Sequence, residues 1–488
     1  MRLLRKLAAL GVAALFGAIA ALLAIYIATV RAMPDLAPWH EPLLERDFRA
    51  SDTGEDLAAY LAREARIFDE LEQRVAAGNG DEATATFSRY VAGSPSNPEL
   101  QPRDWNRTFL HEAPEPKGGV LLLHGLSDSP YTTRTIGEIF REHGFTVLGL
   151  RVPGHGTSPG ELRRARWDDW REAVRLAARH VVDQSGRDRP FFVVGYSNGG
   201  ALAIDYALDA LENPDDPPPT RLVLVAPAIA VSPVAALASF QLRLSAIPGL
   251  EKLAWTSILP EYDPFKYNSF PVSAGEQIHR LTTRLERRLA AAHADGRLAA
   301  FPPTLVFQSV VDATIPPQAI VDRLLARLPP NGSELVLFDV NRLAAAEDLL
   351  RTRHDAFLSS QVEASSLPYA LTVLTNAGPD TQKIVARHRE AGSSADAEAW
   401  SERPLALEWP RGVYSLSHLA LPVPVGDRIY GVGSDDDDPT TLHLGSLELR
   451  GERGVFGIPM DQLMRLRYNP FFPYLRERIE AELANPGS

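Results

Sequence analysis

Short apolar runs alternate with longer amphipathic stretches through the middle of the chain. The runs are bounded by Gly, Pro and polar turn residues, as buried strands are, and they occupy 107–111, 120–123, 146–150, 191–194, 222–225, 305–307 and 335–338. Apolar residues at helical spacing fill most of the intervals, at 132–141, 167–182 and 201–211. Strands without a polar face that alternate with helices form parallel sheets covered on both sides. The pattern therefore predicts an α/β fold with a mostly parallel central sheet and helices on both faces.

The N-terminus has the pattern of a membrane-spanning helix. Arg2, Arg5 and Lys6 precede residues 7–30, which contain no charged side chain. At about 1.5 Å per residue this stretch exceeds the roughly 30 Å of a bilayer's hydrocarbon core, and it is longer than the apolar core of a signal peptide. Because positive flanks stay in the cytoplasm, we expect residues 1–32 to be an uncleaved single-pass anchor. The rest of the chain would then be extracytoplasmic, on the periplasmic side in a bacterium; a cleaved signal peptide and a buried soluble helix are the alternatives.

Residues 33–106 separate this anchor from the first strands. The segment 33–50 contains prolines and is interpreted as a linker. Helical spacing of apolar residues then predicts an amphipathic helix at 53–77, packed on the surface of the main domain; these residues are Leu57, Leu61, Ile67, Leu71 and Val75.

The alternating strands and helices indicate a main domain over residues 107–425. Two long intervals interrupt the alternation. We interpret 228–302 as an inserted cap, and 340–412 as a second insertion with one helix and one strand. Residues 426–488 are interpreted as a C-terminal extension.

Charge and composition narrow the range of partners. The formal net charge is −12 and no dense stripe of Lys or Arg is present, which argues against nucleic-acid binding, because phosphate recognition needs clustered positive charge. Cysteine is absent, which excludes thiolate nucleophiles, thiolate metal sites and disulfides. No H-E-x-x-H or comparable ligand spacing occurs, and no Gly-rich phosphate loop. We therefore expect no metal and no cofactor, and we interpret the acidic run 435–438 as a solvated loop.

A G-x-S-x-G motif is the strongest chemical signal in the chain. Gly195, Ser197 and Gly199 follow the apolar run 191–194 and precede a helix-forming stretch, the context in which this motif forms a sharp strand-to-helix turn. Such a turn exposes the serine hydroxyl, and glycines are needed because side chains there would collide with neighbouring strands. Free N–H groups at the start of the following helix add positive character beside the hydroxyl. We expect Ser197 to be a nucleophile.

An upstream strand ends in a second loop that complements this turn. The segment 119–130 is an apolar run followed by His124 and Gly125. Two backbone N–H groups aimed at one point stabilise the negative oxygen of a tetrahedral intermediate. We expect the N–H groups of Leu126 and Asn198 to form this oxyanion hole, and His124 to fix the loop instead of transferring protons.

Four motifs together resemble the monoacylglycerol lipase and carboxylesterase branch of the α/β-hydrolases. They are His124-Gly125, Arg151-Val-Pro-Gly-His-Gly156, Trp167-Asp-Asp-Trp170 and Gly195-Tyr-Ser-Asn-Gly199. The resemblance covers about 107–227, resumes near 304–316 and is weak elsewhere. It implies an α/β-hydrolase fold and a serine hydrolase whose triad follows the chain order Ser, acid, His. It also implies that the Pro-Gly-His-Gly segment shapes a loop near the pocket, so that His155 is structural.

The resemblance places the acid of the triad after a late strand. Asp312 follows the apolar run 305–307 and would orient the base that activates Ser197. The family often has a glycine three residues before the acid, and here Ser309 takes that position. A structural turn aspartate is the alternative for Asp312.

The base is the hardest residue to assign, because His354, His388, His418 and His443 all follow Asp312. The family's usual spacing favours His354, but this residue ends a charged helical run and has the pattern of a solvent-facing histidine. His418 lies in an apolar, turn-bounded segment that is typical of a buried loop histidine. We expect His418 to be the base, provided that residues 340–412 fold outside the main sheet, and His354 is the main alternative.

These residues together predict hydrolysis of a carboxylic ester through an acyl-enzyme. The cap is rich in apolar residues that suit an acyl group, and we expect Phe240, Leu244 and Trp255 to bind the substrate together with Tyr196. The expected partners are an acyl ester or lipid-like substrate and a membrane. A peptidase or thioesterase shares the same machinery, and a non-catalytic, membrane-tethered binding protein is the alternative from another class.

Overall fold

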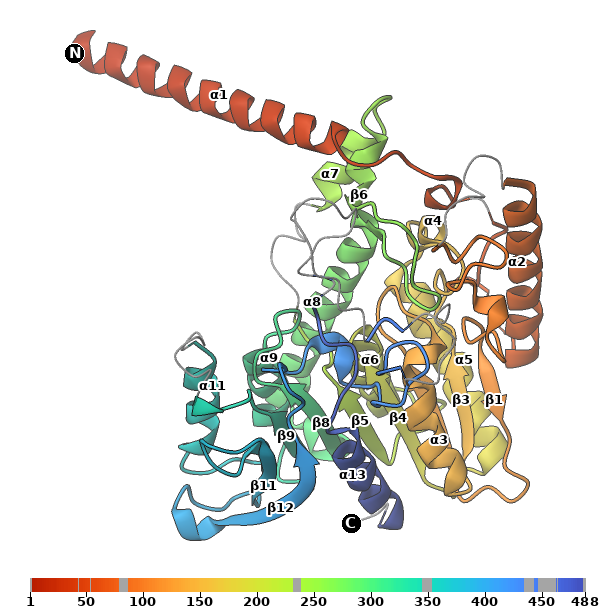
Figure 1. Cartoon of the computed structure of the whole chain (residues 1–488), viewed down its shortest axis with the longest axis vertical. Helices are drawn as coiled ribbons and strands as arrows, with labels where there is room; N and C mark the ends of the chain where they lie inside the picture. The colour runs from red at the N-terminus through yellow and green to blue at the C-terminus, as the bar shows by residue number, and fades with distance from the viewer. Residues whose placement is uncertain are drawn as a thin grey trace.

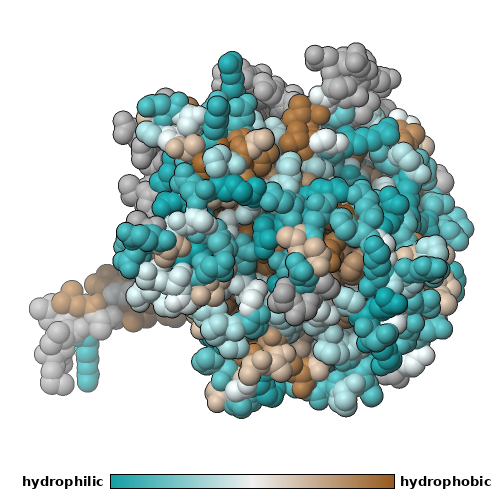
Figure 2. Space-filling view, turned by 90° about the horizontal axis from the view of Figure 1, so that it is seen from below, coloured by the Kyte–Doolittle hydropathy of each residue, from teal (hydrophilic) through white to brown (hydrophobic). Residues whose placement is uncertain are grey.

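The computed structural model describes residues 2–42, 44–52, 54–78, 87–230, 238–344, 353–433, 443–445, 462 and 464–485. Its most prominent outlying element is helix α1 (Arg2–Arg31), which projects from the body beside α7 (Ala238–Ser245) and β6 (Trp255–Ser257), as Figure 1 shows. Most of the apolar side chains described along α1 are exposed, whereas Val30 near its end is buried. The helix stands clear of a mostly hydrophilic body (Figure 2).

A ten-stranded sheet forms the centre of the body. All neighbouring strands from β3 to β10 are parallel, whereas β1 at one edge and β11 and β12 at the other are antiparallel. In order across the sheet, the strands are β1 (Phe109–His111), β3 (Thr146–Leu150), β2 (Gly119–Leu123), β4 (Phe191–Tyr196), β5 (Arg221–Val225), β8 (Thr304–Ser309), β9 (Glu334–Phe338), β10 (Ala370–Asn376), β11 (Lys383–Arg389) and β12 (Trp400–Glu408). The mostly parallel sheet expected from the sequence is confirmed.

Each central strand divides its side chains between two apolar layers. In β2, Leu121 and Leu123 belong to one cluster, and Val120 and Leu122 belong to the other, because successive side chains of a strand point to opposite faces. One layer contains α5 (Trp167–Ser185), α6 (Asn198–Glu212), α8 (Val272–Ala294) and α9 (Pro317–Arg323), and the other contains α3 (Arg134–Glu142) and α13 (Phe472–Ala484). Burial on both faces explains why the central strands are continuously apolar.

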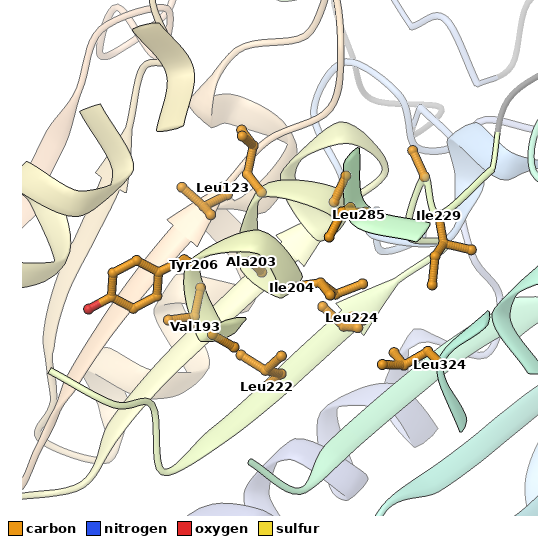
Figure 3. Packing of buried hydrophobic residues seen from close by; sticks show 14 of the residues in the cluster. Leu123, Val193, Ala203, Ile204, Tyr206, Leu222, Leu224, Ile229, Leu285 and Leu324 are labelled. Atoms are coloured by element: carbon orange, nitrogen blue, oxygen red, sulfur yellow. The ribbon is translucent and has the colours of Figure 1, made fainter. Parts of the chain in front are cut away.

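Figure 3 shows the first layer where α6 crosses the sheet. Ala203 and Ile204 of α6 gather with Val193 of β4 and Leu224 of β5, and Leu285 of α8 lies in the same layer. All five side chains are fully buried. Small and branched side chains let the helix approach the strands closely, and this fixes the start of α6 relative to the end of β4.

Strand register brings the ends of the central strands to one edge of the sheet. Leu123 at the end of β2 pairs with Gly195, Tyr196 at the end of β4 pairs with Val225, and Val225 pairs with Phe307 of β8. The residues that follow these strands therefore begin their loops side by side, which is where parallel α/β sheets bind ligands.

The interval 340–412 extends the main sheet, so the expectation that it would fold outside that sheet is wrong. Helix α11 (Arg353–Val362) leads to β10, which pairs in parallel with β9, and β11 and β12 follow as antiparallel strands. We predicted one strand here, at 369–374, and missed the other two. The side chains of β12 are mostly exposed, and charged residues interrupt both strands, so neither has the apolar pattern of a buried strand.

Two further segments belong to the body more closely than we predicted. Helix α8 lies within the interval interpreted as a cap, but its Leu281, Leu285 and Leu289 are fully buried in the layer beneath the sheet. Helix α13 lies within the predicted C-terminal extension, and its Leu475 and Ile479 are fully buried in the opposite layer. The boundaries proposed at 302, for the cap, and at 425, for the main domain, therefore separate segments that pack together in one core.

The segment 33–50 is docked against the body and is not a free linker. His40 is buried and bonds through Nε2 to Ser269 Oγ at 3.0 Å, Leu44 N–H donates to Glu161, and Asp47 pairs with buried Arg151 at 2.9 Å. Helix α2 (Leu57–Gly78) then packs its Leu57 and Tyr60 into the main core, which confirms the amphipathic helix. Thr53, expected near its start, lies outside the described residues, but Asp56 Oδ1 accepts Ala59 N–H at 2.8 Å as an N-terminal cap does.

Truncation of Leu475 tests whether α13 is part of the folded core. We expect Leu475→Ala to lower the free energy of unfolding by about 2–5 kcal/mol, because it opens a cavity beneath the sheet. Glu477→Ala on the same helix is the control, since that side chain is half-exposed and makes only a surface ion pair with Arg403, worth about 1 kcal/mol or less. Denaturant unfolding of the detergent-solubilised chain measures both variants, and equal effects would show that α13 is peripheral.

Candidate active site

Ser197 occupies the tight turn between β4 and α6. Its backbone has φ +52° and ψ −115°, a region that non-glycine residues adopt only when the surrounding structure holds them there. Its N–H donates to the Val225 carbonyl at 3.0 Å, and its carbonyl accepts the N–H groups of Gly200 and Ala228 at 2.9 and 2.8 Å. The side chain of Ser197 is half-exposed although both of its neighbours are buried. The turn therefore presents a hydroxyl from an otherwise closed surface.

The glycines around Ser197 are required by close backbone contacts. A Cβ on Gly195 would lie 2.4 Å from the Gly199 carbonyl oxygen, and one on Gly199 would lie 2.1 Å from the Leu123 carbonyl oxygen. A Cβ on Gly200 would lie 2.6 Å from the side chain of Pro227. The turn can form only because these three positions carry no side chain.

Asp312 and His418 form a buried pair beside this turn. His418 Nδ1 lies 2.7 Å from Asp312 Oδ2, and the two side chains are 5% and 0% exposed. Asp312 Oδ1 also accepts the N–H groups of Thr314 and Ile315 at 2.8 and 2.9 Å, and Oδ2 accepts Gln308 Nε2 at 3.0 Å. Burial raises the pKa of Asp312, but the charge of His418 and these hydrogen bonds outweigh burial and hold the pKa below its usual value. The carboxylate of Asp312 is therefore placed to accept a proton from His418 Nδ1.

The loop that carries His418 is held by neighbouring strands. Ser309 Oγ at the end of β8 donates to the Leu416 carbonyl at 2.9 Å, and Tyr196 Oη donates to the His418 carbonyl at 3.4 Å. The Tyr196 ring also lies 5.3 Å from the imidazole. Ser309, where the family often has glycine, thus supplies a hydrogen bond that fixes the histidine loop.

The loop after β2 lies next to Ser197, as expected for an oxyanion hole. Within the described part of the chain, neither Leu126 N–H nor Asn198 N–H donates to a protein acceptor. His124 accepts Val152 N–H on Nε2 at 3.0 Å and bonds to the Gly125 carbonyl through Nδ1 at 2.8 Å. Burial and the nearby His155 lower the pKa of His124 well below its usual value. Both nitrogens are committed to backbone groups, which fits the expectation that His124 fixes this loop.

Leu126, Ser197, Asn198 and His418 all line one pocket of about 410 Å³. The apolar part of its wall includes Ala228, Phe270, Ile278, Ile315 and Leu419, and the polar part includes Asp128, Tyr262, Lys266, Asn268, Arg465 and Arg467. A serine hydroxyl, an imidazole paired with a carboxylate and two N–H groups without a described protein acceptor thus border a single cavity, which is the arrangement that acyl transfer requires.

Comparison with known proteins agrees with this geometry. Residues 114–341 match the family described as serine aminopeptidase, S33. A thermostable monoacylglycerol lipase from Bacillus sp. (strain H-257) is 26% identical over 200 residues, which are 41% of this chain and 72% of that protein. The chain has an α/β-hydrolase fold and is similar to the monoacylglycerol lipase-like branch.

Solved structures of two lipolytic enzymes are also similar to this α/β-hydrolase. One comes from the metagenome-derived enzymes LipS and LipT, with 23% identity, a TM-score of 0.36 and coverage of 52% of this chain and 98% of that one. The other is the Paleococcus ferrophilus monoacylglycerol lipase, with 24% identity, a TM-score of 0.36 and coverage of 48% of this chain and 88% of that one.

Two of the cap residues expected to bind substrate, Leu244 and Trp255, are not part of the pocket wall. Trp255 is 2% exposed and packs with Met33 and Leu36 of the N-terminal segment and against the His40 ring. Leu244 is half-buried on α7 and does not line the pocket. Phe240 lies in α7, but its side chain is outside the described residues. Trp255 therefore attaches the N-terminal segment to the cap, and we correct its expected role in substrate binding.

Among the other histidines, none with a described side chain borders the pocket. His155 is fully buried against backbone carbonyls, and burial lowers its pKa to about 4, which fits the structural role expected for it. His388 lies on β11 and bonds to Thr372 at 2.8 Å. His354 lies in α11, but its side chain is outside the described residues. The acidic run 435–438 also lies outside the described residues. Among the described residues, no group of three His, Asp or Glu side chains is placed to hold a metal ion.

Several pocket residues were missed by the sequence analysis. Gln308 supports Asp312, and Asp128 forms an ion pair with Lys266 of the cap. The N–H of Tyr267 donates to the carbonyl of Ser127, which has a positive φ of 66°. Arg465 and Arg467 come from the C-terminal segment. Among these residues, only Gln308 could have been identified from the sequence, because it is a polar residue next to Ser309 at the end of the apolar run.

Substitution of Gly199 tests the contact that shapes the turn. We expect Gly199→Ala to destabilise the fold by about 1–3 kcal/mol or more, because the methyl group meets rigid backbone of Leu123. Gly275→Ala in α8 is the matched control, since its nearest neighbour would be Phe270 Cε1 at 3.8 Å, and alanine favours a helix by up to about 1 kcal/mol. Denaturant unfolding compares the two, and a neutral Gly199→Ala would contradict the close approach.

Proposed function

We propose that this chain is a membrane-anchored serine hydrolase that cleaves carboxylic esters through an acyl-enzyme on Ser197. The observation that carries the proposal is the shared pocket: Ser197 on its strained turn and the buried pair of His418 and Asp312 border the same cavity. The similarity to a monoacylglycerol lipase supports an ester as the substrate.

Each residue has one task in the proposed reaction. His418 Nε2 takes the proton from Ser197 Oγ as the oxygen attacks the acyl carbonyl carbon, and Asp312 stabilises the imidazolium through Nδ1–H. The N–H groups of Leu126 and Asn198 bind the oxyanion. His418 then gives its proton to the leaving alcohol, and the C–O bond breaks. Water, deprotonated by His418, attacks the acyl-enzyme and releases the acid and Ser197.

The charge of the pocket favours an ester over an aminopeptidase substrate, although the matching family is described by a peptidase. An aminopeptidase must bind a positively charged amino group, for which it needs an unpaired carboxylate. Asp128 is the carboxylate that lines this pocket, and Lys266 already pairs with it. We expect aminoacyl p-nitroanilides to be much poorer substrates than p-nitrophenyl esters.

Helix α1 supports the proposal of a membrane anchor. Its apolar stretch is long enough to cross a bilayer and is not buried in the body, and Arg2, Arg5 and Lys6 lie at its start. The residues after α1 are fastened to the cap: Lys252 Nζ bonds to the Met33 carbonyl at 2.6 Å and pairs with Asp35 at 2.9 Å. An anchor attached to the cap would hold the pocket close to the membrane surface, where lipid-like esters are concentrated.

Removal of the nucleophile tests the catalytic proposal. Ser197→Ala should fold normally, lose essentially all hydrolysis of p-nitrophenyl esters and lose all labelling by a fluorophosphonate probe. Retained labelling of the folded variant would overturn the assignment and favour another nucleophile. Absence of labelling in the wild-type chain would favour the non-catalytic binding protein.

The same assay of p-nitrophenyl ester hydrolysis distinguishes between the two candidate bases, His418 and His354. His418→Ala should lower kcat by several orders of magnitude, because Ser197 then has no group to take its proton. His354→Ala should change kcat by less than about threefold. The opposite ranking would show that His418 has only a structural role.

Reporter fusions test the orientation of the anchor. Because positive residues precede the apolar helix, alkaline phosphatase fused after residue 50 should be active in a bacterial host. Green fluorescent protein fused at the same point would be exported, and it should not fluoresce. An active cytoplasmic reporter at this point would reverse the proposed topology.

A further inference from the structure

More cationic than anionic side chains line the active-site pocket. Lys266, Arg465 and Arg467 line it together with one carboxylate, Asp128. Lys266 pairs with Asp128, and Arg467 pairs with buried Asp263 at 3.5 Å. Among the described residues, no carboxylate lies within ion-pair distance of Arg465. Arg465 is therefore the pocket cation with which no described carboxylate forms an ion pair, and its guanidinium can bind an anion from outside the protein.

Arg465 is held at the pocket by contacts with the catalytic loops. Its Nη2 donates to Thr314 Oγ1 at 3.4 Å, and Thr314 N–H in turn donates to Asp312. Burial and the carboxylates of Asp128 and Asp312 raise the pKa of Tyr196. The positive charge of Arg465 opposes that rise, so its guanidinium lies within electrostatic reach of the residue next to Ser197. The side chain of Arg465 is half-exposed, so a ligand can still reach it.

The side of the pocket on which Arg465 lies indicates which half of the ester it meets. The alcohol half must leave beside His418, because His418 protonates the leaving oxygen. Arg465 contacts Thr314, which belongs to the turn that also holds the carboxylate of Asp312. Leu126 and Asn198, which would hold the carbonyl oxygen, come from different loops. Because this contact puts Arg465 on the wall of the acid and histidine loops, we assign its guanidinium to the half of the pocket that the leaving alcohol would occupy.

We propose that Arg465 binds an anionic group, a phosphate or a carboxylate, on the alcohol half of the ester substrate. This inference rests on the proposed function and defines its substrate class: acyl esters of negatively charged alcohols. A planar guanidinium can donate two parallel hydrogen bonds to either anion. Lys266 and Arg467 already pair with carboxylates, so Arg465 is the pocket cation that is available for this contact.

Two matched pairs of substrates test the proposal. One pair is an acyl ester of 4-hydroxybenzoate and the same ester of 4-hydroxybenzamide, and the other is 1-acylglycerol 3-phosphate and 1-acylglycerol with the same acyl chain. The measured quantity is kcat/KM for the anionic ester divided by kcat/KM for the neutral ester. We expect Arg465→Gln to lower this ratio about tenfold or more in at least one pair, because a charge-assisted hydrogen bond is lost. Arg465→Lys should retain part of the ratio.

Arg403→Gln is the control for the loss of one positive charge, since Arg403 lies on β12 and pairs with Glu477 at the surface. It should leave the ratio at the wild-type value. A loss of ratio with the phosphate pair alone, or with the carboxylate pair alone, supports the proposal and identifies the anion. An unchanged ratio in Arg465→Gln for both pairs would overturn it.

A third pair tests the assignment to the alcohol half. p-Nitrophenyl hemiglutarate carries its carboxylate on the acyl side, and p-nitrophenyl butyrate is its neutral counterpart. A preference for the hemiglutarate that Arg465→Gln abolishes would overturn the placement on the alcohol side. Ser197→Ala separates this inference from the proposed function: if that variant still hydrolyses all the esters, the proposed function itself fails, whatever Arg465 does.

Discussion

The start of helix α6 is so close to its neighbours that no side chain fits at Gly195, Gly199 or Gly200. Gly195 of strand β4 meets the backbone of α6, Gly199 meets the end of β2, and Gly200 meets Pro227 after β5. The approach forces Ser197 into a left-handed backbone conformation, and hydrogen bonds from β5 and its following loop hold it there. The same contact brings the start of α6 against the end of β2, so the oxyanion loop is positioned by backbone and not by flexible side chains. The arrangement of nucleophile and N–H donors therefore depends on steric crowding, which is rigid and does not vary with pH or salt.

A buried ion network joins the N-terminal segments to this framework. Arg151 has a side chain that is 1% exposed, and it pairs with Asp47 at 2.9 Å and with Glu64 at 2.8 Å. Asp47 also accepts Gly154 N–H at 2.8 Å, in the Pro-Gly-His-Gly loop beside the pocket. Removal of one partner from such a pair leaves a buried charge and costs about 3–5 kcal/mol. The network makes the segments before β1 part of the domain, although their sequence had the pattern of a linker and a surface helix.

The sequence predicted best where burial is uniform. The run 191–194 became β4 (Phe191–Tyr196), and 120–123 became β2 (Gly119–Leu123), because strands covered on both faces have no polar positions. The choice of His418 over His354 rested on its apolar, turn-bounded surroundings, and the structure places His418 against Asp312. The condition attached to that choice was wrong, because β10 to β12 extend the sheet at the edge beyond β9 and the chain then returns to the pocket.

The remaining errors concern contacts between segments that are distant in sequence. β11 and β12 carry charged side chains because they lie near an edge of the sheet, so their pattern is that of surface chain. Trp255 has the composition of a substrate-binding residue, yet Met33 and Leu36 cover it. Arg465 differs from the other arginines only in where the fold brings it and in what lies nearby. Pairings of this kind are decided by tertiary structure and leave no local periodicity.

The pair formed by Asp312 and His418 spans 106 positions, and this separation has a consequence for the order of assembly. Contacts between remote segments form late, because the intervening chain must lose its freedom first. During synthesis helix α1 emerges before Ser197 and Asp312, and the loop of His418 and helix α13 emerge after them. The nascent chain therefore contains an incomplete set of these groups until the segment around His418 has docked.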